Sequence, residues 1–142
     1  MKNLATLVRL HKWRIDESTR KLADLDSLAT RFHGQIADIG DGLAAEAPFA
    51  ADSVESAASY SNFLQVEIAR RRTLEHSLVD LEQEIVCARE QIAAAYRELK
   101  TYEITLERKR KQAKRIQDRR QQSVLDEVGK TLHRTRASER LA

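Results

Sequence analysis

The chain has 142 residues, of which 33% are charged, 5% are aromatic and one is proline. This composition is typical of long helices and argues against a large globular core. No apolar stretch approaches the ~20 residues that are needed to span a bilayer. A single cysteine, Cys87, cannot form an internal disulfide, which fits a reducing cytoplasm.

The first third of the chain predicts a helix over residues 3–44. Its apolar residues recur in alternating steps of three and four, the spacing of a seam that faces a partner helix. The seam positions are Leu4, Val8, His11, Ile15, Ser18, Leu22, Leu25, Ala29, Phe32, Ile36, Ile39 and Leu43. Only His11 and Ser18 are polar, and we interpret His11 as a histidine tolerated in the seam rather than a ligand.

A connection is predicted over residues 45–52. Gly40, Gly42 and Pro48 form the only glycine and proline cluster of the chain. Asp52, followed three residues later by Glu55, resembles a capping box at the start of a second helix. Because the connection is short, the two helices should pack antiparallel.

The second helix is predicted over residues 53–136, with ten consecutive apolar seam positions. These are Leu74, Leu78, Leu81, Ile85, Ala88, Ile92, Ala95, Leu99, Tyr102 and Leu106. Glu67 and Arg71 occupy the seam positions just before them, so we expect imperfect pairing there.

The predicted fold class is therefore all-α. We expect a two-helix antiparallel coiled-coil hairpin, one domain over residues 1–142, whose longer second helix overhangs the first. If the chain reverses in the middle of the connection, facing residues have numbers that sum to about 100, which places Leu4 near Tyr96. The second helix then lacks a partner beyond about Tyr102, leaving an overhang over 107–136 and a frayed tail over 137–142.

The overhang is strongly basic. Eight basic residues and one acidic residue lie between Arg108 and Arg120, and residues 107–136 carry a net charge of +7. A seam that turns polar where its partner helix ends favours docking on carboxylates, with which arginine pairs well. Nucleic-acid phosphates would also attract it at low salt, but no aromatic residues are interleaved for base stacking. A membrane-binding apolar face is missing, although anionic lipid would attract the charges.

Two further groups contain apolar residues that lie off the seam. Leu7, Leu10 and Trp13 lie near the amino terminus, and the block from Tyr60 to Ile68 has apolar groups on both helix faces near the hairpin tip. The amino-terminal group indicates a partner contact, whereas the block near the tip either is covered by the connection or forms a docking surface.

No motif for catalysis or cofactor binding occurs in the sequence. Its four glycines form no phosphate-binding loop, and its four histidines are too dispersed for a zinc site. Asp38 and Asp41 lack the ligand series of a calcium loop. We therefore expect no enzyme activity, no catalytic residues, no metal and no cofactor.

Three blocks of sequence carry a family resemblance. They are Leu4-x-x-Leu7-x-Arg9-Leu10-x-x-Trp13-Arg14-x-Asp16-Glu17, then Tyr60-x-x-Phe63-Leu64, then a tail with Leu106-Glu107-Arg108-Lys109, Arg119-Arg120 and Leu125-Asp126-Glu127. In this order and spacing they resemble FliJ, the cytoplasmic stalk of the flagellar type III export apparatus. The resemblance covers nearly the whole chain.

The resemblance implies an antiparallel coiled coil, similar to the central stalk of rotary ATPases, in the cytoplasm at the inner face of the cell membrane. The end with both termini would enter and stimulate the hexameric export ATPase FliI, and the other end would bind the export gate protein FlhA. The regulator FliH and export chaperones, which the family helps to recycle, are further implied partners. The implied ATPase-binding residues are Leu7, Leu10, Trp13, Arg108, Arg110, Lys114 and Arg115. The implied gate-binding residues are Tyr60, Phe63, Leu64 and Glu67.

The residues alone leave alternatives open. The equivalent stalk of a virulence injectisome would fit the same physics. A basic coiled-coil module would bind nucleic acid, and long seams also form self-associating rods. Stimulation of an export ATPase would distinguish a stalk from a nucleic-acid-binding module and from a self-associating rod.

Overall fold

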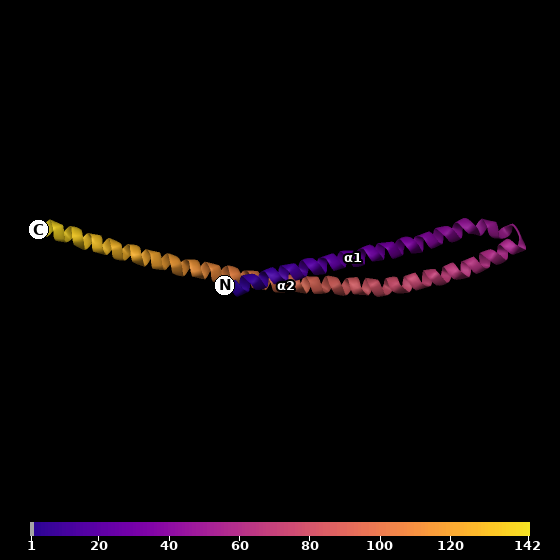
Figure 1. Cartoon of the computed structure of the whole chain (residues 1–142), viewed down its shortest axis with the longest axis horizontal. Coiled ribbons are helices and arrows are strands. Elements are labelled where there is room, and N and C mark those ends of the chain that lie inside the picture. Colours follow the sequence, from indigo (N-terminus) through magenta and orange to yellow (C-terminus); the bar gives the residue numbers. More distant parts are fainter. Residues whose placement is uncertain (1) are drawn as a thin grey trace. The chain divides into compact units, whose positions relative to one another are not determined.

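The computed structural model describes residues 2–142, which form two long helices joined by a short one (Figure 1). Helix α1 spans Lys2–Glu46, the 3₁₀ helix η1 spans Ala47–Ala51, and helix α2 spans Val54–Leu141. No strand occurs in this described part of the chain. The predicted all-α hairpin, with the second helix longer than the first, is confirmed.

The chain divides into two compact units, which are described separately. The first unit consists of Trp13–Tyr96 and contains the connection between the helices. The second unit consists of the amino-terminal residues up to Lys12 together with Arg97–Ala142.

In the first unit, α1 and α2 run antiparallel. Asp26 Oδ1 lies 3.5 Å from Arg89 Nη2, and further along α1 His33 Nε2 lies 3.6 Å from Glu82 Oε1, earlier on α2. The core cluster consists of Ala29, Leu78, Leu81 and Ile85, against which Leu22, Leu25, Leu28, Phe32 and Ile36 pack. All but Leu28 are predicted seam positions, so the heptad spacing identified this core.

In the second unit, the first turns of α1 pack against the part of α2 that ends near residue 110. Val8 and Leu106 are buried there. The ring of His11 stacks on that of Tyr102, with centroids 4.9 Å apart. Lys12 Nζ lies 3.3 Å from Glu103 Oε1. The polar seam position at His11 is therefore filled by an aromatic stack with another seam residue.

The burial of individual residues supports both predicted seams. Every position of the second seam, from Leu74 to Leu106, is buried or half-buried. Every position of the first seam is also buried or half-buried, except Ser18, which is exposed. Glu67 and Arg71 are half-buried, and the buried Arg71 Nε has no hydrogen-bond partner, although it lies 3.7 Å from Glu75 Oε1. Pairing is imperfect at this point, as expected.

The predicted pairing register is wrong. A sum of about 100 would place residue 74 opposite Asp26, but Asp26 contacts Arg89, a shift of about two heptads. In the second unit, Arg110 lines a groove with Ala5 and Arg9, so α2 keeps a partner well past Tyr102. Because a seam repeats every seven residues, sliding by whole heptads buries similar side chains, and the sequence pattern does not distinguish these registers.

The connection begins and ends close to the predicted residues. α1 continues through Gly40 and Gly42 to Glu46, and no glycine has a positive φ. Pro48 lies in the first turn of η1, where its missing N–H leaves no hydrogen bond unmade. α2 runs to Leu141, so the predicted tail is helical rather than frayed.

The residue that caps α2 differs from the prediction. Ser56 N–H donates a 3.0 Å hydrogen bond to Ser53 Oγ, which in turn donates to Ser56 Oγ. The capping box assigned to Asp52 and Glu55 is therefore wrong by one position. Asp52 instead ends η1, with its N–H donating to Phe49 O.

Candidate partner-binding surfaces

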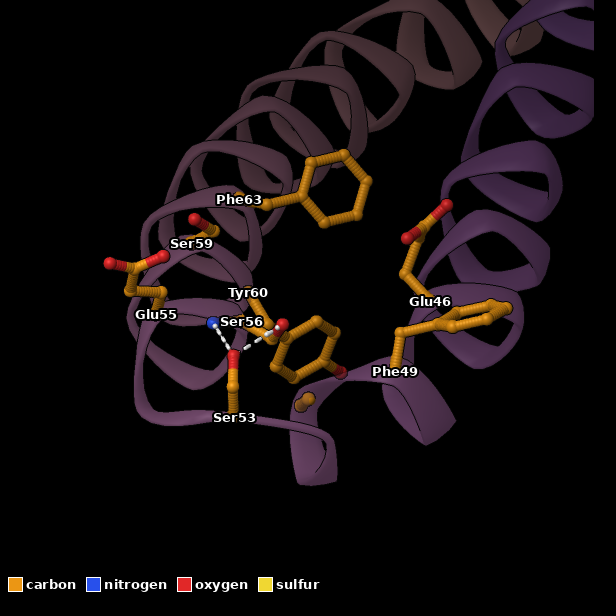
Figure 2. Close-up of a pocket in the computed structure, with 9 residues that line it drawn as sticks. Glu46, Phe49, Ser53, Glu55, Ser56, Ser59, Tyr60 and Phe63 are labelled. Atoms are coloured by element: carbon orange, nitrogen blue, oxygen red, sulfur yellow. Dashed lines mark hydrogen bonds between the residues drawn. The ribbon is translucent and has the colours of Figure 1, made fainter.

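A hollow of about 590 Å³ lies at the tip of the hairpin, in the first unit. Its lining comprises Glu46, Phe49, Ala50, Ser53, Glu55, Ser56, Ser59, Tyr60 and Phe63. Figure 2 shows the rings of Tyr60 and Phe63 projecting from α2 toward the side that carries Glu46 and Phe49. Three aromatic side chains thus surround one open space, next to the point where the chain reverses.

The hollow exists because the first turns of α2 face the end of α1 and η1 rather than a continuous seam. Pro48 directs the chain into η1, and the Ser53 cap starts α2. Residues 50–59 are mainly alanine and serine, whose side chains are too small to close the space.

The charge of the tip is entirely acidic. Residues 34–69 contain six acidic residues and no lysine or arginine. Two of the acids, Glu46 and Glu55, line the hollow. Neither forms an ion pair within residues 2–142. The hollow therefore combines aromatic walls with unpaired carboxylates.

The structure brings together two of the four residues assigned to gate binding. Tyr60 and Phe63 line the hollow, and Phe63 is 38% exposed. Leu64 is half-buried and lies outside the lining, as does Glu67, whose Oε2 lies 3.8 Å from Arg70 Nη1.

Sequence reasoning missed Phe49, which lines the same hollow and is 61% exposed. It lies in the predicted connection, outside any helical period. An aromatic residue next to the only proline of the chain was the available signal.

The second candidate surface is the arm, which we define as residues 107–142 of α2. Every residue from 111 to 142 is exposed. Lys111 Nζ lies 3.8 Å from Glu107 Oε1. Arg108, Arg110, Lys114 and Arg115 form no ion pair among the described residues, so their charges face solvent.

The basic residues of the arm surround the helix. With 3.6 residues per turn, Arg108, Lys111 and Arg115 lie along one face. Arg110 and Lys114 lie along a second face. Lys109 and Arg120, eleven positions apart, lie along a third. Positive charge is consequently available in every direction around the helix axis.

The residues assigned to ATPase binding on α1 differ in exposure. Leu7 is half-buried and Leu10 is 40% exposed. Arg110 lines a groove of about 310 Å³ with residues that include Val8 and Lys12. In the first unit, Trp13 is 59% exposed.

Two further properties of the described residues bear on the site. No group of three or more histidine, cysteine, aspartate or glutamate side chains in residues 2–142 is placed to hold a metal ion. Neither of the helices, as far as they are described, has a window apolar enough to cross a membrane.

Comparison with known proteins identifies the family. A family profile described as Flagellar FliJ protein matches residues 1–138 of the 142-residue chain. No curated protein and no solved structure matches the chain. The resemblance of the three sequence blocks is thereby confirmed over nearly the full length. The chain belongs to the FliJ family and is associated with flagellar protein export.

Proposed function

We propose that this chain is a stalk of the flagellar type III export apparatus, acting through binding rather than catalysis. Its arm inserts into the hexameric export ATPase FliI and stimulates ATP hydrolysis, and its tip binds the export gate protein FlhA. It works in the cytoplasm, held peripherally at the inner face of the membrane by the apparatus. FliH and the export chaperones, which it helps to recycle, are further partners.

The observation that carries the proposal is that most of the arm, residues 111–142, is exposed and has no helix partner in the described chain. Positive charge on one face would fit a flat anionic surface, such as a lipid headgroup layer or a duplex. Charge in every direction fits an anionic wall that encloses the helix, because each face then meets carboxylates. A ring of ATPase subunits provides such an enclosure, and membership of the FliJ family directs the choice to the export ATPase.

The tip supports a second, different partner. Exposed Phe49 and Phe63 offer apolar contact area, and aromatic side chains are enriched at the centres of protein interfaces. The acidic tip and the basic arm attract partners of opposite charge, which suits a protein that links two machines.

Charge reversal in the arm tests the ATPase contact. The variant R108E/R110E/K114E/R115E should abolish stimulation of FliI hydrolysis, because four attractive charges become repulsive in the proposed contact. The matched control is R20E/K21E/R31E/R72E, which changes the net charge equally at exposed residues outside the arm. Far-UV circular dichroism should give the same helicity for both variants, because none of the eight residues is buried.

The control variant should keep most of the stimulation. Stimulation that survives the arm variant would overturn the proposal. Salt-dependent DNA binding by the wild-type chain, with no effect on ATP hydrolysis, would instead favour a nucleic-acid-binding module.

A further inference from the structure

We propose that the tip hollow receives an arginine side chain from a basic segment of a partner protein. The inference rests on the proposed function only in naming the gate protein as that partner. The chemistry of the hollow itself is argued from its lining.

The aromatic walls favour a cation with an apolar stem. Phe49, Tyr60 and Phe63 surround the space, and Figure 2 shows the rings of Tyr60 and Phe63 turned toward the facing side of the hairpin. A guanidinium group stacks on an aromatic face, and its alkyl stem packs against the neighbouring ring. Arginine suits this arrangement better than lysine because its planar, weakly hydrated group stacks.

The carboxylates also favour a positively charged occupant. Glu46 lies on the side of the hollow that faces Tyr60 and Phe63, whereas Glu55 lies at its outer rim (Figure 2). A purely apolar occupant would remove water from Glu46 without supplying a partner, which costs free energy. An anionic occupant would be repelled. Only a cation both covers the rings and pairs with the carboxylate.

No basic residue of the tip competes for this position. Between Arg31 and Arg70 the sequence has no lysine or arginine, while six acidic residues occur in residues 34–69. The local potential is thus negative and attracts a basic segment before contact is made. A volume of about 590 Å³ leaves room for an arginine side chain.

A peptide titration followed by NMR tests the proposal. The probe is a blocked nine-residue peptide with three arginines separated by serines, and the controls replace arginine by lysine or by norleucine. The arginine peptide should shift the ring resonances of Phe49, Tyr60 and Phe63. The lysine peptide should bind more weakly, and the norleucine peptide should cause no shift. Equal binding of the arginine and norleucine peptides would overturn the proposal.

Substitutions in the lining separate a specific contact from general attraction. Glu46→Gln should weaken arginine-peptide binding about fivefold and E46Q/E55Q about tenfold, since each exposed pair contributes modestly. The matched control is Asp38→Asn, which removes the same charge from the same acidic stretch outside the lining. It should change binding less than twofold. An equal loss in D38N and E46Q would overturn a specific site.

Binding of the cytosolic domain of the gate protein, measured with the same variants, distinguishes failure of the inference from failure of the proposed function. A gate domain that binds wild type and E46Q/E55Q equally would contradict the arginine contact and leave the proposed function standing. An arginine peptide that binds, together with a gate domain that does not, would support the hollow as an arginine site and contradict the assigned partner. Self-association that is lost in E46Q/E55Q would identify the arm of a second copy as the occupant and overturn the assignment to another protein.

Discussion

At the residue scale, the start of α2 depends on one serine. Ser53 Oγ accepts the N–H of Ser56 at 3.0 Å, whereas the side chain predicted to cap, Asp52, makes no hydrogen bond to the first turn. Ser53→Ala should therefore lower the free energy of unfolding by about 1 kcal/mol. Urea titration gives this value, and amide exchange at Ser56 should accelerate.

Asp52→Ala is the matched test of the capping residue. Its effect on stability should be less than half that of Ser53→Ala, because the structure gives its side chain no capping role. A larger loss of stability in Asp52→Ala than in Ser53→Ala would support the predicted capping box instead. Serine and aspartate are both favoured at this position, so adjacent candidates are not separable by residue type alone.

At the element scale, α1 contains glycines that no turn requires. A Cβ added to Gly34 would meet no atom within 4 Å, and the backbone there is helical. Gly34→Ala should raise the free energy of unfolding by about 1 kcal/mol, because glycine loses more backbone entropy than alanine in a helix. Thermal or urea unfolding checks the gain.

The reverse substitution on the same helix provides the control. Ala37 is exposed and lies three positions further along α1. Ala37→Gly should lower the free energy of unfolding by about 1 kcal/mol. A Gly34→Ala variant that is less stable than wild type would show that a partner or a bend, rather than the helix itself, determines this position.

At the scale of the whole molecule, folding and the proposed activity should reside in separable parts of α2. A chain ending at residue 110 loses only exposed residues, so its free energy of unfolding should stay within about 0.5 kcal/mol of wild type. The same chain should not stimulate the export ATPase, because most of the arm is gone. Urea unfolding and an ATP hydrolysis assay provide the two measurements.

A second truncation locates the contact within the arm. A chain ending at residue 123 keeps all the basic residues from Arg108 to Arg120 and should retain most of the stimulation. Loss of stimulation in this variant would indicate that the contact is made by exposed apolar residues after residue 123. These include Val124, Leu125 and Leu132.

The candidate sites could be predicted only in part from the sequence. The basic arm is a run of charges, and a run of charges is visible without a structure. The tip hollow is different, because Phe49 lies eleven positions from Tyr60 in the chain and the fold of η1 brings it to the same space. Residues that meet across a reversal of the chain share no sequence period, so pattern reasoning found Tyr60 and Phe63 but not the ring opposite.

The amino-acid sequence alone determined two helices, their seams and the position of the connection, because the three-and-four spacing of apolar residues encodes a helix with one buried stripe. Only the tertiary structure decided which turns of α1 lie against which turns of α2. Seams that repeat every seven residues allow several registers of similar burial, and the chain adopts the one in which Asp26 meets Arg89 and His33 meets Glu82. In this register, the first turns of α2 line the tip hollow. The residues after 110 have no helix partner.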